Sequence, residues 1–255
     1  MTATHRTGPP VVLEQPASGW VRILLNSPDN GNALTTELMT ALLEALDRAE
    51  STAGCRTAVI ASAADGFCSG LALSHAATPE WLEHGEPLPR VLFARLARSP
   101  LVTVALVEGA AYGGGVGLAA ACDQVLVGPG GTFTLTETLL GLIPAIVMPL
   151  IAHRTGPHRA LAMALTAVEL DAEEAVTAGL ADVHCEDVPA ALRLLLRTIG
   201  RTDPAAVQAL KRYHSTLYPP EAQPAGADTV ALRERFADPA TQHRLALFRR
   251  LKVLR

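Results

Sequence analysis

One stretch of small residues constrains the fold of this chain more than any other feature. Residues 108–123 read EGAAYGGGVGLAAACD and directly follow the apolar residues 101–107. Adjacent glycines let a backbone approach a bound group closely, and the free N–H groups at the start of a helix favour negative charge. The pattern predicts a buried strand over 101–107, a glycine turn, and a small-residue helix over 114–122 that begins beside an anion or oxyanion site.

Two further interpretations of this stretch come from its residues alone. Gly115, Gly117 and Ala120 fit the G-x-G-x-x-A pattern of a dinucleotide site, which also needs an acidic residue at the end of the next strand. Residues 125–127 run into a Gly-Pro pair instead, and this disfavours the dinucleotide interpretation. The remaining interpretation is structural, because small side chains let a helix pack tightly against a strand.

Composition excludes several classes of protein. The chain has 255 residues, 49% of them hydrophobic, which is enough for one large folded core. A net charge of -4, with no basic run longer than two residues, argues against nucleic acid or an anionic membrane as a partner, so we expect a small-molecule substrate. The first ten residues are polar and no apolar run approaches the roughly 20 residues of a membrane span, which predicts a cytoplasmic protein.

The cysteines indicate reduced thiols and no metal site. They stand far apart in the chain, without a CxxC pair and without zinc spacing to histidines. The four positions are Cys55, Cys68, Cys122 and Cys185.

Hydrophobic periodicity predicts a repeated strand and helix unit followed by a helical tail. A hairpin is expected over residues 11–25 and a helix over 34–46, with Thr35 as its N-cap. Further strands are expected at 58–61, 101–107 and 125–127, with a helix over 88–97. From residue 145 onward, helical spacing dominates: 146–154, 158–165, 172–178, 190–199, 204–216, 229–236 and 241–251.

Five motifs in this order resemble one known family. They are LLNSPDNGNAL (24–34), GFCSGLALS (66–74), the glycine triplet 113–115, TFTLTETLLGLIP (132–144) and AEEAVTAGLADVH (172–184). Together they resemble the crotonase, or enoyl-CoA hydratase/isomerase, superfamily over about residues 10–220. The resemblance implies an α/β fold, with a crotonase-like repeated ββα core over residues 1–200 and a C-terminal helical oligomerisation region over 201–255.

The resemblance also implies a substrate and a site. The substrate is an acyl thioester, carried on coenzyme A or on the phosphopantetheine of an acyl carrier protein, and no other cofactor and no metal is expected. The backbone N–H groups of Leu71 and Gly114 would bind the thioester oxygen as an enolate forms, and Glu137 would transfer the proton at the α carbon. Read alone, Glu137 fits a surface helix N-terminus better than a catalytic role, and its place in the family motif is what favours catalysis. Substrate-binding positions beside these groups are Ser69, Gly70 and Gly113.

The chain departs from the family's hydratase pattern at its first glutamate. That position is Gly117, so no carboxylate is expected there to activate water, and a glutamate at 117 would raise hydration only if the pocket has room for it. Three alternatives remain: a dehydratase of 3-hydroxyacyl thioesters, an enoyl-CoA isomerase or hydratase using the single glutamate, and a non-catalytic acyl-thioester binding protein.

Two other segments favour the dehydratase. IPAIVMPLIAHRTG (143–156) and LKRY (210–213) resemble the dehydratase of polyketide β-branching cassettes, which converts a 3-hydroxy-3-methylglutaryl group on an acyl carrier protein to the 3-methylglutaconyl group. An Asp common two residues after the loop glycine is Ala72 here. The glutaryl carboxylate needs a cation or hydrogen-bond donors, and the candidates are His75, Tyr112, His84 and Arg90, the first two being preferred.

Oligomerisation is expected from the C-terminal end. Charged residues make up 18% of the chain, below the roughly 25% of an average domain, which suggests surface buried between subunits. Leu245, Phe248, Leu251 and Leu254 form an apolar stripe that packs either within the chain or on a neighbouring subunit. With the resemblance, this predicts a homotrimer or a dimer of trimers.

Overall fold

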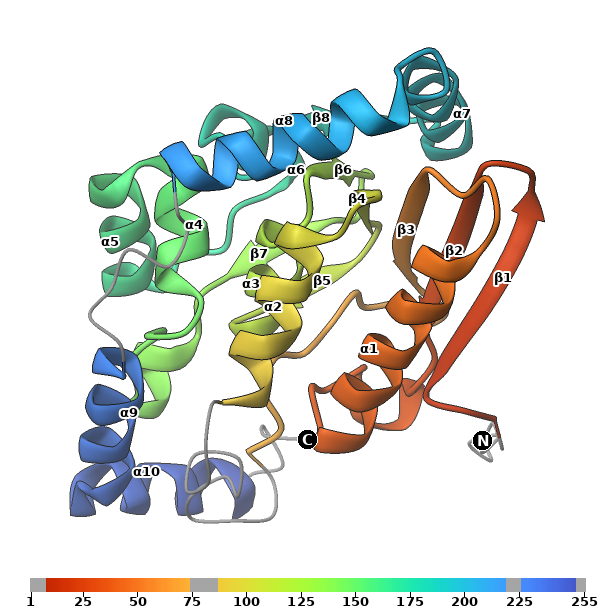
Figure 1. Cartoon of the computed structure of the whole chain (residues 1–255). Coiled ribbons are helices and arrows are strands. Elements are labelled where there is room, and N and C mark those ends of the chain that lie inside the picture. The colour runs from red at the N-terminus through yellow and green to blue at the C-terminus, as the bar shows by residue number, and fades with distance from the viewer. Residues whose placement is uncertain (1–7, 74–86, 219–225, 251–255) are drawn as a thin grey trace.

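The computed structural model describes residues 8–73, 87–218 and 226–250, which form a mixed α/β structure (Figure 1). Its main sheet has six strands in the order β1-β2-β3-β4-β6-β8. β1 (Val11–Ala17) and β2 (Trp20–Leu25) form the predicted antiparallel hairpin, and all later pairings are parallel. The remaining strands are β3 (Thr57–Ser62), β4 (Val102–Val107), β6 (Gln124–Val127) and β8 (Val183–His184).

Both faces of the sheet are covered, which explains the nearly continuous apolar runs of its central strands. Ala58 and Ile60 of β3 face a large core that also holds residues of α1 (Thr36–Ser51) and α2 (Leu88–Arg98). Val59 and Ala61 face a smaller cluster beneath α7 (Val188–Ile199). Figure 1 shows α1 and α2 side by side in front of the strands.

A capping residue marks the start of α1 at the predicted position. The Thr35 hydroxyl accepts a hydrogen bond from the Leu38 N–H at 3.1 Å, so Thr35 is the N-cap of α1 as predicted. The other helices are α3 (Gly114–Ala120), α4 (Met148–Thr155), α5 (Pro157–Thr166), α6 (Ala172–Thr177), α8 (Pro204–Leu217), α9 (Ala227–Ala237) and α10 (Pro239–Arg250), with the 3₁₀ helices η1 (Pro28–Asn30) and η3 (Glu137–Leu140).

A second, smaller sheet is present that periodicity did not predict. After β4 the chain continues into β5 (Ala110–Tyr112), and after β6 it continues into β7 (Thr132–Thr134), where these two short strands pair in parallel. Isolated bridges extend the pairing to the neighbouring units, joining Leu34 to Leu71 and Cys68 to Ala111. This sheet ties the repeated units together at the ends from which the glycine loops leave.

The C-terminal apolar stripe is covered within the chain as far as it is described. Leu245 is 1% exposed and Phe248 packs against the main core, whereas Leu251 and Leu254 lie outside the described residues. Packing within one chain therefore accounts for these two side chains, and they give no support to a subunit interface. Figure 1 shows α9 and α10 at the end of the molecule away from α7.

Two further predictions concern membrane-spanning segments and the state of the cysteines. Among the described residues, no helix combines the length and apolarity that crossing a bilayer requires. All four cysteines are free thiols, with Cys68 and Cys122 buried and Cys55 and Cys185 half-buried.

Candidate active site

The loop after β3 is held between two other segments of the chain. On one side, the Tyr112 N–H donates to the Cys68 carbonyl at 2.9 Å. On the other side, the Leu34 N–H donates to the Gly70 carbonyl at 2.8 Å, and the Ala72 N–H donates to the Leu34 carbonyl at 3.3 Å. The loop that carries Leu71 therefore runs beside the turn that leads from β5 into α3.

This arrangement brings two backbone amides together. A Cβ built on Gly114 would lie 3.2 Å from the nitrogen of Leu71, and one built on Gly70 would lie 3.2 Å from the nitrogen of Gly114. In the described part of the chain, neither N–H donates to another backbone carbonyl. Both residues line the same cavity, so two adjacent donors are available to an oxygen bound there.

Gly70 permits this approach for two reasons. Its φ of +88° lies in the left-handed region, and a Cβ there would stand 2.6 Å from the carbonyl oxygen of Tyr112. Ser69 holds the other end of the turn, because its hydroxyl donates to the Asn30 carbonyl at 3.0 Å. The buried Asn32, which the sequence did not single out, donates to the Phe67 carbonyl at 3.1 Å and steadies the same loop.

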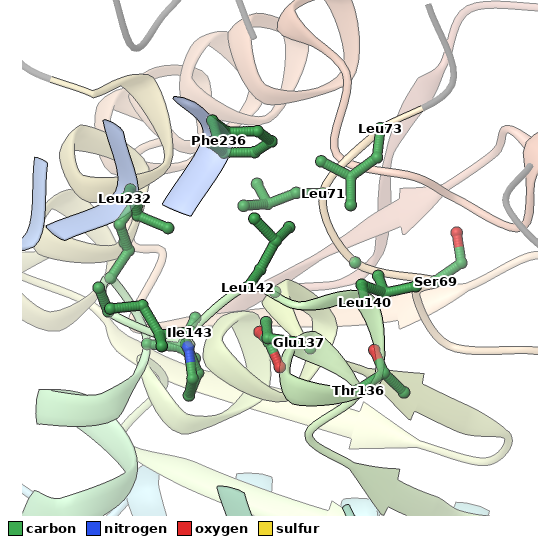
Figure 2. Close-up of a pocket in the computed structure, with 17 residues that line it drawn as sticks. Ser69, Leu71, Leu73, Thr136, Glu137, Leu140, Leu142, Ile143, Leu232 and Phe236 are labelled. Carbon is green, nitrogen blue, oxygen red and sulfur yellow. The ribbon is translucent and has the colours of Figure 1, made fainter. Parts of the chain in front are cut away.

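The cavity has a volume of about 630 Å³, its open mouth included, and its wall is mostly apolar. Figure 2 shows Leu71, Leu142, Leu232 and Phe236 around the space above the carboxyl group of Glu137. Leu232 and Phe236 belong to α9, so the C-terminal helices share in the site of the same chain. Among the described lining residues the polar side chains are Ser69, Thr136 and Glu137, and none is a cation.

Glu137 opens η3 and is the one carboxylate in the described wall of the cavity. A Cβ on Gly113 would lie 2.9 Å from its Oε1, and Gly113 has a φ of +48°, so glycine is required there by both space and conformation. Its Oε2 atom is buried and has no hydrogen-bond partner among the residues that the structure describes. Burial raises the pKa of Glu137 from 4.5 to about 7, so the carboxyl can both take and give a proton near neutral pH.

Helices α9 and α10 hold the segment that begins with Glu137. The Gly141 carbonyl, at the end of η3, accepts from Arg235 Nε at 2.8 Å and from the Thr241 hydroxyl at 3.0 Å. The Leu142 N–H donates to the Glu137 carbonyl at 2.9 Å, which closes the turn. No local pattern marks Arg235 or Thr241, because each acts on a residue about a hundred positions away in the chain.

Position 117 has no room for a side chain. A Cβ on Gly117 would lie 2.3 Å from Cγ1 and 2.9 Å from Cβ of Val147, whose side chain is 2% exposed. The pocket therefore has no room for a glutamate at 117 without other changes, so this substitution alone is not expected to raise hydration.

The structure brings most of the predicted site residues together and separates others. One cavity is lined by Ser69, Gly70, Leu71, Gly113, Gly114 and Glu137. Tyr112 is not among the residues that line it, and this residue is 36% exposed, so its contact with substrate stays a prediction. Arg90 is engaged in a salt bridge with the buried Asp228 of α9 and does not line the cavity either. His75 and His84 lie outside the described residues.

Two N–H donors and one carboxyl with a raised pKa thus lie in one apolar cavity of an α/β fold, the arrangement that the resemblance to crotonases implied. A family profile described as Enoyl-CoA hydratase/isomerase matches residues 16–243. The chain therefore belongs to the enoyl-CoA hydratase/isomerase family.

Known proteins agree with this assignment. The Mycobacterium tuberculosis protein named Probable enoyl-CoA hydratase EchA14 is 37% identical over 180 residues, which cover 68% of this chain and 69% of that protein. A crystal structure of an enoyl-CoA hydratase from Mycobacterium avium is 28% identical, with a TM-score of 0.86 over 95% of this chain and 96% of that one. A Bacillus subtilis structure described as a polyketide biosynthesis enoyl-CoA hydratase (pksH) is 23% identical, with a TM-score of 0.85 over 93% of this chain and 96% of that one, and this likeness concerns the fold.

The matches to curated relatives are partial in length. The matched stretches span between 51% and 69% of the relatives' own lengths, which is about half to two thirds.

Proposed function

We propose that this chain dehydrates a 3-hydroxyacyl thioester to the 2-enoyl thioester, with Glu137 as its single acid and base. The observation that carries the proposal is the placement of one carboxyl, with a pKa raised to about 7, in the same cavity as the free N–H groups of Leu71 and Gly114. The described wall of that cavity holds no second carboxylate.

The proposed reaction proceeds through an enolate. The thioester oxygen accepts hydrogen bonds from the N–H groups of Leu71 and Gly114, which stabilise the charge that grows on it. The Glu137 carboxylate removes a proton from the α carbon and forms the enolate. The electron pair then forms the carbon–carbon double bond as the bond to the 3-oxygen breaks, and Glu137 returns its proton to that oxygen, which leaves as water. These steps use the chain's own groups and require no metal and no redox cofactor.

The finer form of the proposal is a 3-hydroxy-3-methylglutaryl group on an acyl carrier protein. It is supported by residues 143–156, which resemble the β-branching dehydratase. The apolar wall points instead to an acyl group without a terminal charge. A comparison of 3-hydroxy-3-methylglutaryl and 3-hydroxy-3-methylbutyryl groups on the same carrier protein decides between these, since the two differ by the terminal carboxylate.

A second candidate is the enoyl isomerase. A single carboxyl can remove a proton from one carbon of a 3-enoyl thioester and return it to another, and the apolar wall would keep water away from the intermediate. Conversion of a 3-enoyl thioester to its 2-enoyl isomer, with the 3-hydroxyacyl substrates left intact, would make this the function.

The test begins with the step that both candidates share. Exchange of the α protons of a saturated acyl-CoA in D₂O, followed by NMR, reports enolate formation without any later step. The wild type is expected to exchange these protons, and Glu137→Gln is expected to lose about 100-fold or more. Mass spectrometry of the carrier-bound 3-hydroxyacyl groups then detects the loss of one water. A wild-type protein that binds acyl-CoA and exchanges no proton would be a binding protein, contrary to the proposal.

A further inference from the structure

We propose that Val147 is a specificity-determining residue: with Gly117 it occupies the place of a second carboxylate and restricts the site to reactions that Glu137 performs alone. The inference rests on the proposed function and names the residue that sets its scope. Val147 lies in residues 143–156, whose resemblance to the β-branching dehydratase gave this side chain no role of its own.

A side chain at position 117 would point at a residue of the cavity wall. Gly117 lies in α3, the helix that follows Gly113. A Cβ on Gly113 would lie 2.9 Å from Glu137 Oε1, and a Cβ on Gly117 would meet Val147, which lines the same cavity as Glu137. A longer side chain at 117 would therefore have to enter the space that Val147 occupies.

The Val147 side chain occupies the space beside Gly117. It lines the cavity, and it blocks a Cβ on Gly117 with two of its own atoms, Cγ1 at 2.3 Å and Cβ at 2.9 Å. The Cε2 atom of Phe93 would lie 3.3 Å from the same added Cβ on Gly117. Because contacts this short require something to shift, position 117 accepts glycine alone while valine stands at 147.

The backbone of Val147 is held in place and cannot readily withdraw. The Val147 carbonyl accepts the N–H of Ile151 at 3.1 Å, and the next residue, Met148, donates its N–H to the Pro144 carbonyl at 2.8 Å. Val147 thus anchors the start of α4, with its side chain buried. At Val147 the cavity wall therefore consists of methyl groups, which can neither orient a water molecule nor donate a proton.

The consequence is that hydration of simple enoyl thioesters is limited by a pair of residues. Gly117→Glu alone would overpack the site, whereas Gly117→Glu combined with Val147→Gly would provide both the carboxylate and its space. Glycine is chosen at 147 because the Val147 Cβ is itself one of the two blocking atoms.

The packing part is tested by thermal denaturation, without reference to activity. Gly117→Ala adds a single carbon at the blocked point and should lower the melting temperature by about 5 °C. In a Val147→Gly background the same change should cost clearly less, so that the two substitutions are not additive. If Gly117→Ala leaves the melting temperature unchanged, or if its effect is the same in both backgrounds, Val147 does not fill the site and the inference is wrong.

The chemical part compares two variants that differ by one functional group. Gly117→Glu/Val147→Gly and Gly117→Gln/Val147→Gly have side chains of equal size at 117, and the first has a carboxylate. Hydration of crotonyl-CoA, followed by loss of the conjugated enoyl absorbance, is expected to be about 100-fold faster with the carboxylate. Equal rates, or a wild-type rate as high as that of the glutamate variant, would overturn the inference.

Alpha-proton exchange separates this inference from the proposed function. Each variant is assayed for exchange as well as hydration, and the ratio of the two rates is compared, so that a general loss of activity is not mistaken for a change in specificity. Absence of exchange in the wild type would remove the proposed function, while the thermal experiment would still decide whether Val147 closes position 117.

Discussion

Replacing Glu137 with glutamine should raise the stability of the protein at alkaline pH while it abolishes proton transfer. Burial raises the pKa of Glu137 from 4.5 to about 7, so the folded protein holds this proton more strongly than the unfolded chain does. The stabilisation from the neutral carboxyl is complete below about pH 4.5 and is lost as the pH rises through about 7. At about 1.4 kcal/mol per pKa unit, the ionised carboxylate costs the fold about 3 kcal/mol.

Glutamine retains the shape of the neutral acid and cannot ionise. Urea denaturation at about pH 8.5 should therefore give Glu137→Gln a free energy of unfolding about 3 kcal/mol higher than that of the wild type, and the difference should disappear near pH 4.5. In the same variant, α-proton exchange should fall by about 100-fold or more.

A matched control separates the site from a general effect of removing a charge. Glu173 is exposed at the start of α6, and Glu173→Gln should change neither the exchange rate nor the pH dependence of stability. Parallel stability curves for the wild type and Glu137→Gln from about pH 4.5 to 8.5 would refute the argument that burial of this carboxyl destabilises the fold. Near-normal exchange in Glu137→Gln would refute its role as the base.

Three further predictions concern the surroundings of the site, and a fourth concerns the oligomeric state. Gly70→Ala places a side chain at a positive φ and against a carbonyl oxygen, so a lower melting temperature and a loss of α-proton exchange of about 100-fold are expected. Arg90→Leu leaves Asp228 buried without its partner and should cost about 3 to 5 kcal/mol in urea denaturation, whereas adding Asp228→Asn should recover part of that loss. Arg235→Ala removes one of the two hydrogen bonds that hold the Gly141 carbonyl at the end of η3, and steady-state kinetics should show kcat lowered by about 10-fold with a smaller effect on KM. Arg235→Lys should retain more activity than the alanine variant. Light scattering at micromolar concentration should give the mass of a trimer or a dimer of trimers, and a mass near 26.7 kDa would contradict this prediction.

The sequence determined the elements whose signals are local. Alternating and helical hydrophobic spacing predicted the first hairpin, helix α1 with its Thr35 cap, and the central strands, because each of these patterns follows from which side of one element faces the core. The amide pair of Leu71 and Gly114 was expected from the family resemblance that the glycine motifs carry. The structure adds the physical reason for one of these glycines, because Gly70 has a positive φ and approaches another backbone segment closely.

The tertiary structure decided what depends on contacts between distant segments. Strands β5 and β7 have three residues each, too few to show a period, and they exist because they pair with each other. The burial that raises the pKa of Glu137 comes from segments around it, whereas its own local pattern favours a surface helix N-terminus.

The same holds for the residues that complete the site. Arg235 reaches Gly141 across 94 positions of the chain, and Val147 meets Gly117 between two different helices, so neither contact has a local pattern. Arg90, a candidate for binding a substrate carboxylate, is instead committed to Asp228. Hydrophobic periodicity records the environment of one element, whereas the partner of a charged or blocking side chain is set by how the elements pack, and packing exists only in the folded chain.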